Sequence, residues 1–299
     1  MPEGHTLHRL ARTLTDHFGG RRVEVSSPQG RFAEEAAALD GSAVEGAEAW
    51  GKHLFVAFEG ERFVHVHLGL YGKLHVYDGP PPAPVGQVRM RLVTPPGVAA
   101  TGPDGSRPGL AEGERPAYAD LRGATACELV TDEQRAAVVA RLGPDPLRSD
   151  ADPAAAWTRV SRSRTPIGTL LMDQSVVAGV GTVYRAEVLF RHRIHPLRPG
   201  RTLRRGQFEA MWADLVELMA EGVQTGRIDT GRPEHTPEAM GREPRRDDHG
   251  GEVYVYRRHE QPCHVCGATV RTEVLATRNS FWCPRCQPTF RSRAVDANL

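Results

Sequence analysis

The stretch 263–286 reads CHVCGATVRTEVLATRNSFWCPRC and carries four of the five cysteines of this 299-residue chain. Cys263 and Cys266 form one CxxC pair, Cys283 and Cys286 form a second, and sixteen residues (267–282) separate the pairs. This spacing is typical of zinc sites with four cysteine ligands, because each CxxC turn directs two thiolates at one ion. Alternating apolar residues between the pairs predict a two-stranded hairpin with its turn at residues 278–280. We therefore expect a C-terminal zinc ribbon.

Two disulfides, or four reduced thiols without a ligand, would fit the same spacing. A cytoplasmic location disfavours disulfides, and the sequence shows neither a secretory signal nor an apolar run near the roughly 20 residues of a membrane helix. We expect a cytoplasmic protein with one structural Zn²⁺, whose four protein ligands leave no open position for catalysis. The fifth cysteine, Cys127, lies in the apolar stretch ACELV and is expected to be a small buried residue.

Short helices are expected between residues 131 and 225. Thr131 and Gln134 form a capping box at the start of one of them. The pairs Asp152–Pro153 and Thr165–Pro166 each predict an N-cap followed by proline in the first turn. Residues 208–218 repeat apolar side chains at helical spacing, which indicates a core-facing stripe.

Another helix is expected to begin at about Thr182, directly after Gly179 and Gly181. Glycines before a helix let the backbone approach a ligand, and the N–H groups of the first helical turn attract anions. A tight helix–helix turn is the alternative. A nucleotide-binding fold would need a preceding strand, whereas the preceding segment is expected to be helical. A phosphate of a nucleic acid backbone is therefore the better candidate.

Charge is unevenly distributed along the chain, although the formal net charge is only +1. Residues 1–147 carry 15 Lys+Arg and 19 Asp+Glu, a balance of −4, whereas residues 148–299 carry 23 and 18, a balance of +5. The basic C-terminal half mildly favours an anionic partner.

The N-terminal half is expected to be mostly β. A helix over residues 5–17 precedes alternating apolar residues at 53–77, 85–94 and 127–131, which predict a sandwich or flattened barrel. Residues 94–118 form a long loop rich in Gly and Pro. We predict an α+β, multidomain chain with a β-sandwich over 1–130, a helical domain over 131–225, and a linker with a zinc finger (about 254–288) over 226–299.

The chain begins MPEGHT. If Met1 is removed, Pro2 becomes an N-terminal secondary amine, and an α-amine has a pKa of about 8. A useful fraction is then neutral near pH 7, so it can attack an aldehyde-level carbon to give an iminium ion. Glu3 stands next to it as a possible proton donor. An ordinary mobile terminus is the alternative.

Five motifs together resemble the formamidopyrimidine-DNA glycosylase/endonuclease VIII family. They are MPEG at 1–4, GKHLF at 51–55, HLGLYGKL at 67–74, DQSVVAGVGTVYRAEVLFRHRIHP at 173–196 and RNSFWCPRCQ at 278–287. The MPEGH opening and the LY after HLG are closer to the endonuclease VIII branch. The resemblance implies a β-sandwich, a helix-two-turns-helix domain and a zinc finger, with damaged DNA bound in the cleft between them, and we expect a monomer.

The resemblance also implies roles in cutting DNA. Pro2 would attack C1′ of the damaged nucleotide and displace the base, and the resulting iminium would allow strand scission by β- and δ-elimination. Glu3 would act as a general acid on the sugar, Lys52 as the proton donor for β-elimination, and Arg278 as a phosphate clamp linked to δ-elimination. Oxidised pyrimidines are the more plausible lesions for this branch.

Further residues are expected to contact DNA. Extruding a base from the stack costs a few kcal/mol, and Leu70 and Tyr71 are suited to wedge into the space that it leaves. Strand core is the alternative for this pair, but the flanking Gly69 and Gly72 favour a loop. Arg122 matches the family's loop arginine that reaches the orphan strand. Gly181 and Thr182 are expected to hold a phosphate near the lesion.

Two positions depart from the family pattern. Thr182 stands where the family's GxGN motif has asparagine, so one phosphate contact is expected to be weaker. Gly69 stands where the endonuclease VIII branch can carry a polar residue, which leaves the identity of the excised base open. A DNA-damage binding protein without turnover is the competing interpretation. A zinc-ribbon transcription factor is a third, although it leaves the N-terminus unexplained.

Overall fold

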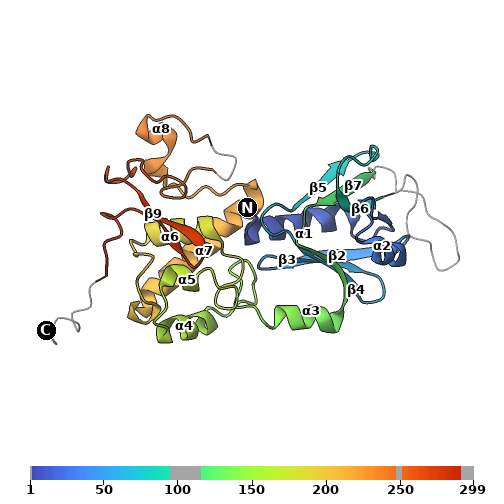
Figure 1. The fold of residues 1–299 in the computed structure, drawn as a ribbon, viewed down its shortest axis with the longest axis horizontal. Helices are drawn as coiled ribbons and strands as arrows, with labels where there is room; N and C mark the ends of the chain where they lie inside the picture. The colour runs from blue at the N-terminus through green and yellow to red at the C-terminus, as the bar shows by residue number, and fades with distance from the viewer. Residues whose placement is uncertain (1, 95–115, 247–250, 291–299) are drawn as a thin grey trace. The chain divides into compact units, whose positions relative to one another are not determined.

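The computed structural model describes residues 2–94, 116–246 and 251–290 (Figure 1). It divides into two compact units, residues 1–141 and 142–299. Almost all of the loop predicted over 94–118 lies outside the described residues. The predicted three-domain boundaries remain a prediction, and the two units are described separately below.

The first unit is a β-sandwich of two antiparallel four-stranded sheets, as predicted. One sheet has the order β1-β6-β7-β5 and the other the order β2-β3-β4-β8. The strands are β1 (Glu24–Ser26), β2 (Val44–Trp50), β3 (His53–Phe58), β4 (Arg62–His67), β5 (Lys73–Asp78), β6 (Val88–Val93), β7 (Ala117–Arg122) and β8 (Ala126–Thr131). Apolar side chains from both sheets meet in one core. It includes Cys127, which is only 2% exposed, and burial raises the pKa of its thiol to about 12.

Three helices accompany the sandwich: α1 (Gly4–Phe18), α2 (Ala33–Leu39) and α3 (Asp132–Val139). Helix α1 confirms the helix predicted over 5–17, and it buries Leu7, Ala11 and Leu14 against the core. The Thr131–Gln134 capping box is present at the start of α3, which packs on β8 and β4. Because α1 covers the sheet of β2 and β3, it fixes where the N-terminus of the chain lies in this unit.

The second unit combines helices with a β-hairpin. Its helices are α4 (Pro153–Arg162), α5 (Ile167–Leu170), α6 (Thr182–Arg191), α7 (Arg205–Thr225) and α8 (Pro237–Met240), with 3₁₀ turns η1 (Gly200–Thr202) and η2 (Pro233–His235), and its strands are β9 (Arg271–Leu275) and β10 (Arg278–Trp282). One apolar core spans helices α4 to α7, the 253–256 segment and the hairpin. Figure 1 shows the hairpin lying beside α6, and the two elements are in contact.

Helix starts in this unit partly match the prediction. Asp152 caps α4 by accepting from the Ala154 N–H, with Pro153 in the first turn. Thr165 does not cap α5: the N-cap is Pro166, which also forms a β-bridge with Pro199. The chain between α5 and α6 makes turns rather than the expected helix, so α6 begins afresh at Thr182.

The predicted position of the turn in the zinc-ribbon hairpin was also wrong. Arg278 pairs with Leu275, so Ala276 and Thr277 form the two-residue turn and residues 278–280 belong to β10. Ala276 and Thr277 have φ of 48° and 64°, the left-handed geometry that two-residue hairpin turns require. Neither residue favours this geometry, and for that reason the sequence pattern pointed to the wrong residues. Arg278 thereby becomes the first strand residue after the turn.

In the part of the chain that the structure describes, the helices all lack the combination of length and apolar content needed to span a bilayer.

Candidate active site and nucleic-acid interface

Glu3 sits at the N-cap of α1 and is fully buried. Its backbone is extended and its carbonyl oxygen accepts from the Thr6 N–H at 2.9 Å, so the helix begins directly after it. The half-buried Pro2 precedes it. A buried carboxyl group therefore adjoins the residue whose amine is expected to react.

The turn between β2 and β3 carries Lys52. Trp50 pairs with His53, so Gly51 and Lys52 form a two-residue turn, and Gly51 has the positive φ (58°) that such a turn needs. Lys52 is half-buried. A tight turn on a paired hairpin restricts the backbone of Lys52 more than a long loop would.

The register of α1 on β2 indicates where Glu3 lies along the sandwich. Thr15 Oγ1 accepts from the Ala47 N–H at 2.9 Å, and Gly19 bridges Val44, so the helix and the strand run in opposite directions. The 11 residues from Thr15 back to Gly4 rise about 16 Å at about 1.5 Å each, the length of about five strand residues at about 3.3 Å. Five residues beyond Ala47 is Lys52. We therefore infer that Glu3 and Lys52 lie at one end of the sandwich.

A histidine cluster next to Lys52 was not foreseen from the sequence. His53 Nδ1 lies 2.9 Å from His65 Nε2, and the His53 ring centroid is 5.1 Å from those of both His65 and His67. Burial lowers the pKa of His53 to about 3, with His65, His67, Arg141 and Lys52 adding to the effect. Burial also lowers the pKa of His65 and of His67. The rings are thus neutral near pH 7, which adds no positive charge around Lys52.

We expect this cluster to make the first unit acid-labile. On unfolding, His53 recovers its ordinary pKa of about 6.5. The unfolded state therefore binds a proton at His53 that the folded state does not bind. Stability is therefore lost as pH falls below 6.5, and levels off only near pH 3. At pH 5 the loss from His53 is about 2 kcal/mol.

Denaturant unfolding at pH 7 and pH 5 measures this effect. The variant His53→Asn should lose less stability between the two pH values than the parent. The exposed His75 lies in the other sheet, so His75→Asn is the control. An equal pH dependence in parent and His53→Asn would show that His53 is not held neutral.

The loop between β4 and β5 presents Leu70 and Tyr71 outward. Tyr71 is 84% exposed and Leu70 is 40% exposed, whereas Leu68 just before them is buried. Gly69 has φ +67°, and a Cβ there would lie 2.0 Å from Thr125 Oγ1. A Cβ on Gly72 would lie 2.2 Å from the Leu68 carbonyl oxygen. Glycine is therefore needed at both ends of this turn, and the pair is not strand core.

Arg122 ends β7 close to the same loop. It pairs with Lys73, and the neighbouring Gly123 packs against the backbone of Tyr71. Arg122 Nη2 donates to Asp120 Oδ2 at 2.9 Å. Asp120 also forms an ion pair with the buried Arg91. The Arg122 side chain remains 41% exposed. The first unit thus gathers the Leu70–Tyr71 loop and Arg122 on neighbouring segments.

In the second unit, Gly181 is the N-cap of α6 and Thr182 is its first residue. Gly181 is extended, with φ −122° and ψ −161°. Thr182 is 5% exposed, so very little of its side chain is open to a phosphate. The N-terminus of a ten-residue helix offers backbone N–H groups to an anion.

Arg278 is exposed at the tip of the hairpin. Among the described residues, the structure gives its guanidinium no hydrogen bond or ion pair. The hairpin itself is held to α6, because Nη2 of the fully buried Arg185 donates to the Asn279 carbonyl oxygen at 2.6 Å. This hydrogen bond positions the strand that carries Arg278 beside the first turns of α6.

The four ribbon cysteines converge, as predicted. Their sulfur atoms lie within 4.8 Å of one another, with 3.4 Å between Cys266 and Cys283 and 3.9 Å between Cys263 and Cys286. Tetrahedral Zn²⁺ with Zn–S bonds of about 2.3 Å separates its sulfur ligands by about 3.8 Å. The arrangement fits one structural zinc ion with all four positions filled by protein.

Gln287, directly after the last cysteine, ties the zinc site to the helical core. Its side-chain oxygen accepts from the Cys283 N–H at 3.0 Å, and its Nε2 donates to the Ile194 carbonyl oxygen at 2.8 Å. It is fully buried. Sequence reasoning missed this role because both partners are backbone groups, and one of them lies far away in the chain.

We expect one zinc ion per chain, lost on Cys283→Ala. Removing one thiolate opens the coordination shell and leaves the hairpin without the metal that folds it. Elemental analysis of purified protein should give a zinc content near one for the parent and near zero for the variant. Cys127→Ala, which removes a cysteine outside the cluster, should keep the full zinc content. Retention of zinc by Cys283→Ala would contradict the assignment.

Glu187 on α6 is a further residue that the sequence did not reveal. It is fully buried, and its carboxylate accepts from the N–H groups of Tyr254 (2.6 Å), Val255 (2.9 Å) and Tyr256 (2.9 Å), and from Thr230 Oγ1 (2.7 Å). Three consecutive backbone donors thus converge on one side chain. Glu187 thereby anchors the segment that leads into the zinc ribbon onto α6.

Comparison with known proteins agrees with this fold. The sequence profile of the Formamidopyrimidine-DNA glycosylase N-terminal domain matches residues 1–126. That of the Formamidopyrimidine-DNA glycosylase H2TH domain matches residues 142–233, and that of the zinc finger found in FPG and IleRS matches residues 260–289. The three matches together cover most of the chain.

Whole proteins and solved structures are also similar. Endonuclease 8 1 of Mycobacterium tuberculosis (strain ATCC 25618 / H37Rv) is 53% identical over 294 residues, covering 96% of this chain and 100% of that protein. The formamidopyrimidine-DNA glycosylase of Chloroflexus aurantiacus is 29% identical over 302 residues, covering 97% and 99%. The Lactococcus lactis enzyme, non-covalently bound to DNA containing an AP site, superposes with a TM-score of 0.72 at 22% identity, covering 96% and 100%.

Sandwich, helix-two-turns-helix segment and zinc ribbon together define a DNA glycosylase of base excision repair, with abasic-site lyase activity. The chain belongs to the formamidopyrimidine-DNA glycosylase/endonuclease VIII family, and the identity to Endonuclease 8 1 supports the resemblance to the endonuclease VIII branch.

Proposed function

We propose that the protein removes oxidised bases, preferentially pyrimidines, from DNA through a Schiff base on Pro2 and then cuts the strand by β,δ-elimination. The observation that carries this proposal is the fully buried Glu3 at the N-cap of α1, directly after Pro2. Lys52 lies in the turn between β2 and β3, which we infer to be at the same end of the sandwich. An amine, a carboxyl group and a lysine in one place suit imine formation and proton transfer.

Each step has a residue suited to it. The Pro2 amine forms the bond to C1′ as the base leaves with the bonding pair. Glu3 donates a proton to the sugar ring oxygen, which opens the ring. Lys52 acts in the proton transfers of β-elimination. Arg278, exposed and without a protein partner among the described residues, clamps the phosphate that leaves in δ-elimination.

DNA binding is assigned to both units. Tyr71 and Leu70 enter the stack in place of the extruded base, Arg122 contacts the orphan strand, and Gly181 with Thr182 binds a phosphate at the start of α6. Damaged DNA is the macromolecular partner in this proposal, and the protein acts as a monomer in the cytoplasm.

Borohydride trapping on abasic-site DNA tests the mechanism. Reduction of the iminium links the protein to the DNA covalently, so a shifted band and a peptide modified at Pro2 are expected. A second candidate, a damage-binding protein without turnover, is favoured only by Thr182 in place of asparagine. Tight binding of abasic DNA with no crosslink would support that second candidate.

We expect Thr182→Asn to bind abasic-site DNA more tightly than the parent. Asparagine reaches further than threonine and its amide can donate to a phosphate, a gain of about 1 kcal/mol or roughly fivefold in Kd. Fluorescence anisotropy with a tetrahydrofuran-containing duplex measures the change, and undamaged duplex is the comparison. Unchanged affinity would mean that residue 182 does not contact the backbone.

A further inference from the structure

An arginine-lined cavity lies in the second unit, and one of its lining residues, His264, stands between the zinc ligands Cys263 and Cys266. Its volume is about 370 Å³, and it is lined by residues of the 242–246 and 257–264 segments. Five of them are arginines, and Glu243 is the one acidic residue in the lining. The arginines are Arg242, Arg245, Arg246, Arg257 and Arg258.

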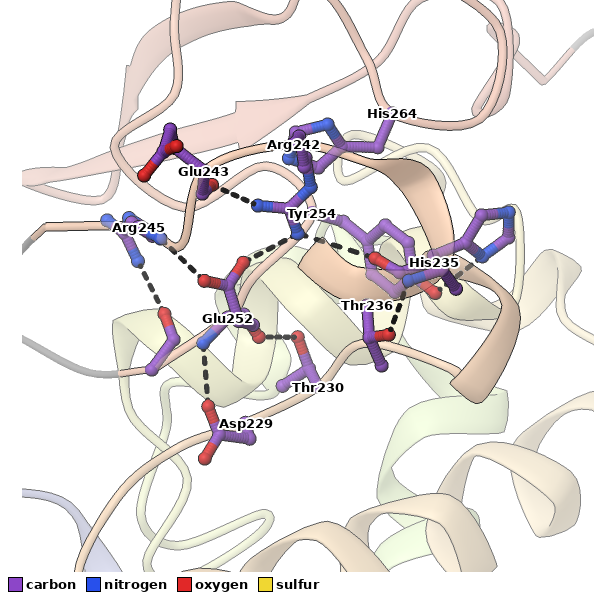
Figure 2. A network of polar contacts seen from close by, with 12 residues as sticks. Asp229, Thr230, His235, Thr236, Arg242, Glu243, Arg245, Glu252, Tyr254 and His264 are labelled. Carbon is purple, nitrogen blue, oxygen red and sulfur yellow. Dashed lines mark hydrogen bonds and ion pairs between the residues drawn. The ribbon is translucent and has the colours of Figure 1, made fainter.

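The network in Figure 2 holds one wall of this cavity in place. Glu252 accepts from Arg242 Nη2 and from the Arg245 N–H, both at 2.6 Å, and its own N–H donates to Asp229 at 2.7 Å. Burial opposes the ionisation of Glu252, but the bonds from Arg245 and Arg242 outweigh it and lower its pKa. Glu252 therefore neutralises Arg242 and fixes the chain before Arg246.

The floor of the cavity carries a positive charge that no carboxylate of the described chain contacts. Arg258 is 5% exposed, and it donates to the carbonyl oxygens of Tyr254 (2.6 Å) and Pro262 (2.8 Å), to Gln261 Oε1 (3.3 Å) and to His264 Nδ1 (3.4 Å). Glu187 acts electrostatically on Arg258 and compensates part of its charge, so the donors open to an anion are the exposed arginines of the rim.

Two donors on the rim of the cavity are available to an anion. Arg246 and Arg257 are exposed on the rim. In the described chain neither guanidinium has a carboxylate partner, and Arg257 lies over the Tyr256 ring at 5.6 Å. The same Glu187 carboxylate that anchors residues 254–256 also fixes the chain before Arg257.

We propose that this arginine cavity is a second phosphate site, which takes phosphodiester groups of the DNA backbone. The proposal rests on DNA being the substrate. A single small anion would occupy one guanidinium fork, whereas the two exposed arginines of the rim belong to two chain segments. Duplex DNA carries one charge per about 1.7 Å of helix axis, so it can meet several of them at once. Contacts of this kind position the duplex without reading its sequence.

The test is the salt dependence of DNA binding by the double variant Arg246→Gln/Arg257→Gln. Removing one arginine–phosphate contact lowers the slope of log K against log salt by about 0.9, so the double variant should show a slope smaller by nearly two units. Binding is measured by anisotropy between about 50 and 200 mM salt, with a tetrahydrofuran-containing duplex and an undamaged duplex. Thermal unfolding verifies that the variant folds like the parent.

Arg12→Gln/Arg31→Gln is the charge-matched control, because both arginines are exposed in the first unit and the net charge changes equally. Equal slopes for the two double variants would overturn the phosphate site. So would a cavity variant that loses affinity for single-stranded RNA alone and keeps the parent's slope on DNA.

Borohydride trapping of the parent on the same duplex sequence, with an abasic site in place of tetrahydrofuran, separates this inference from the proposed function. A reduced slope without any trapped product would support the phosphate site and refute the Schiff-base mechanism. Efficient trapping with an unchanged slope would do the reverse.

Discussion

Blocking the amine of Pro2 should abolish covalent trapping and strand cutting. An N-terminal extension turns Pro2 into an internal residue whose nitrogen is an amide, which cannot attack C1′. We expect single-turnover cutting of abasic-site DNA to fall on the order of 10³-fold or more, as when an enzyme loses its nucleophile. Binding of a tetrahydrofuran duplex, which cannot react, should change far less.

The matched control is the same extended protein after a protease has removed the extension and left Pro2 first. Its activity should return to that of the parent, and mass spectrometry should show the mature N-terminus. Pro2→Gly replaces the secondary amine with a primary amine and should retain part of the trapping. Full crosslinking by the uncleaved extended protein would rule out Pro2 as the nucleophile.

The second large effect is expected at Glu187. Glu187→Gln replaces one carboxylate oxygen with an NH₂ group, which then faces backbone N–H groups that need an acceptor. Leaving buried donors unsatisfied and removing the charge should cost about 3 kcal/mol. For a unit of this size, that corresponds to a melting temperature lower by about 10 °C.

Calorimetry or circular dichroism measures this loss, and zinc release to a chelator should become faster, because the anchored 254–256 segment leads directly into the ribbon. Glu217→Gln removes an exposed carboxylate from α7 and should leave both readouts unchanged. If Glu187→Gln melted like Glu217→Gln, the three N–H contacts would contribute little to stability.

Local patterns in the sequence predicted much of the fold. The alternating strands indicated the sandwich, Thr131 and Gln134 indicated a helix start, and the CxxC pairs indicated the sulfur cluster. These features depend on residues close in sequence, or on a ligand set with fixed spacing. The roles of Pro2, Lys52 and the DNA contacts remain predictions, which the experiments above address.

The features that the sequence did not reveal depend on distant partners. Glu187 binds backbone N–H groups 67 to 69 residues away, and Arg185 binds a carbonyl 94 residues away. Backbone groups are nearly the same in every residue, so no pattern of residue types predicts these side-chain contacts to the backbone. The side-chain contact between His53 and His65 likewise depends on strand register, which pairs His53 with His67. The hairpin turn was misplaced because Ala276 and Thr277 adopt a backbone conformation that their identities do not favour.

The close packing of Gly69 on Thr125 has an evolutionary consequence. Any side chain at position 69 would collide with the Thr125 hydroxyl, and φ +67° would strain it further. A homologue with a polar residue at 69 would need the Thr125 hydroxyl to rotate away, a different residue at 125, or a reshaped turn. In an alignment of many relatives, these two columns should covary.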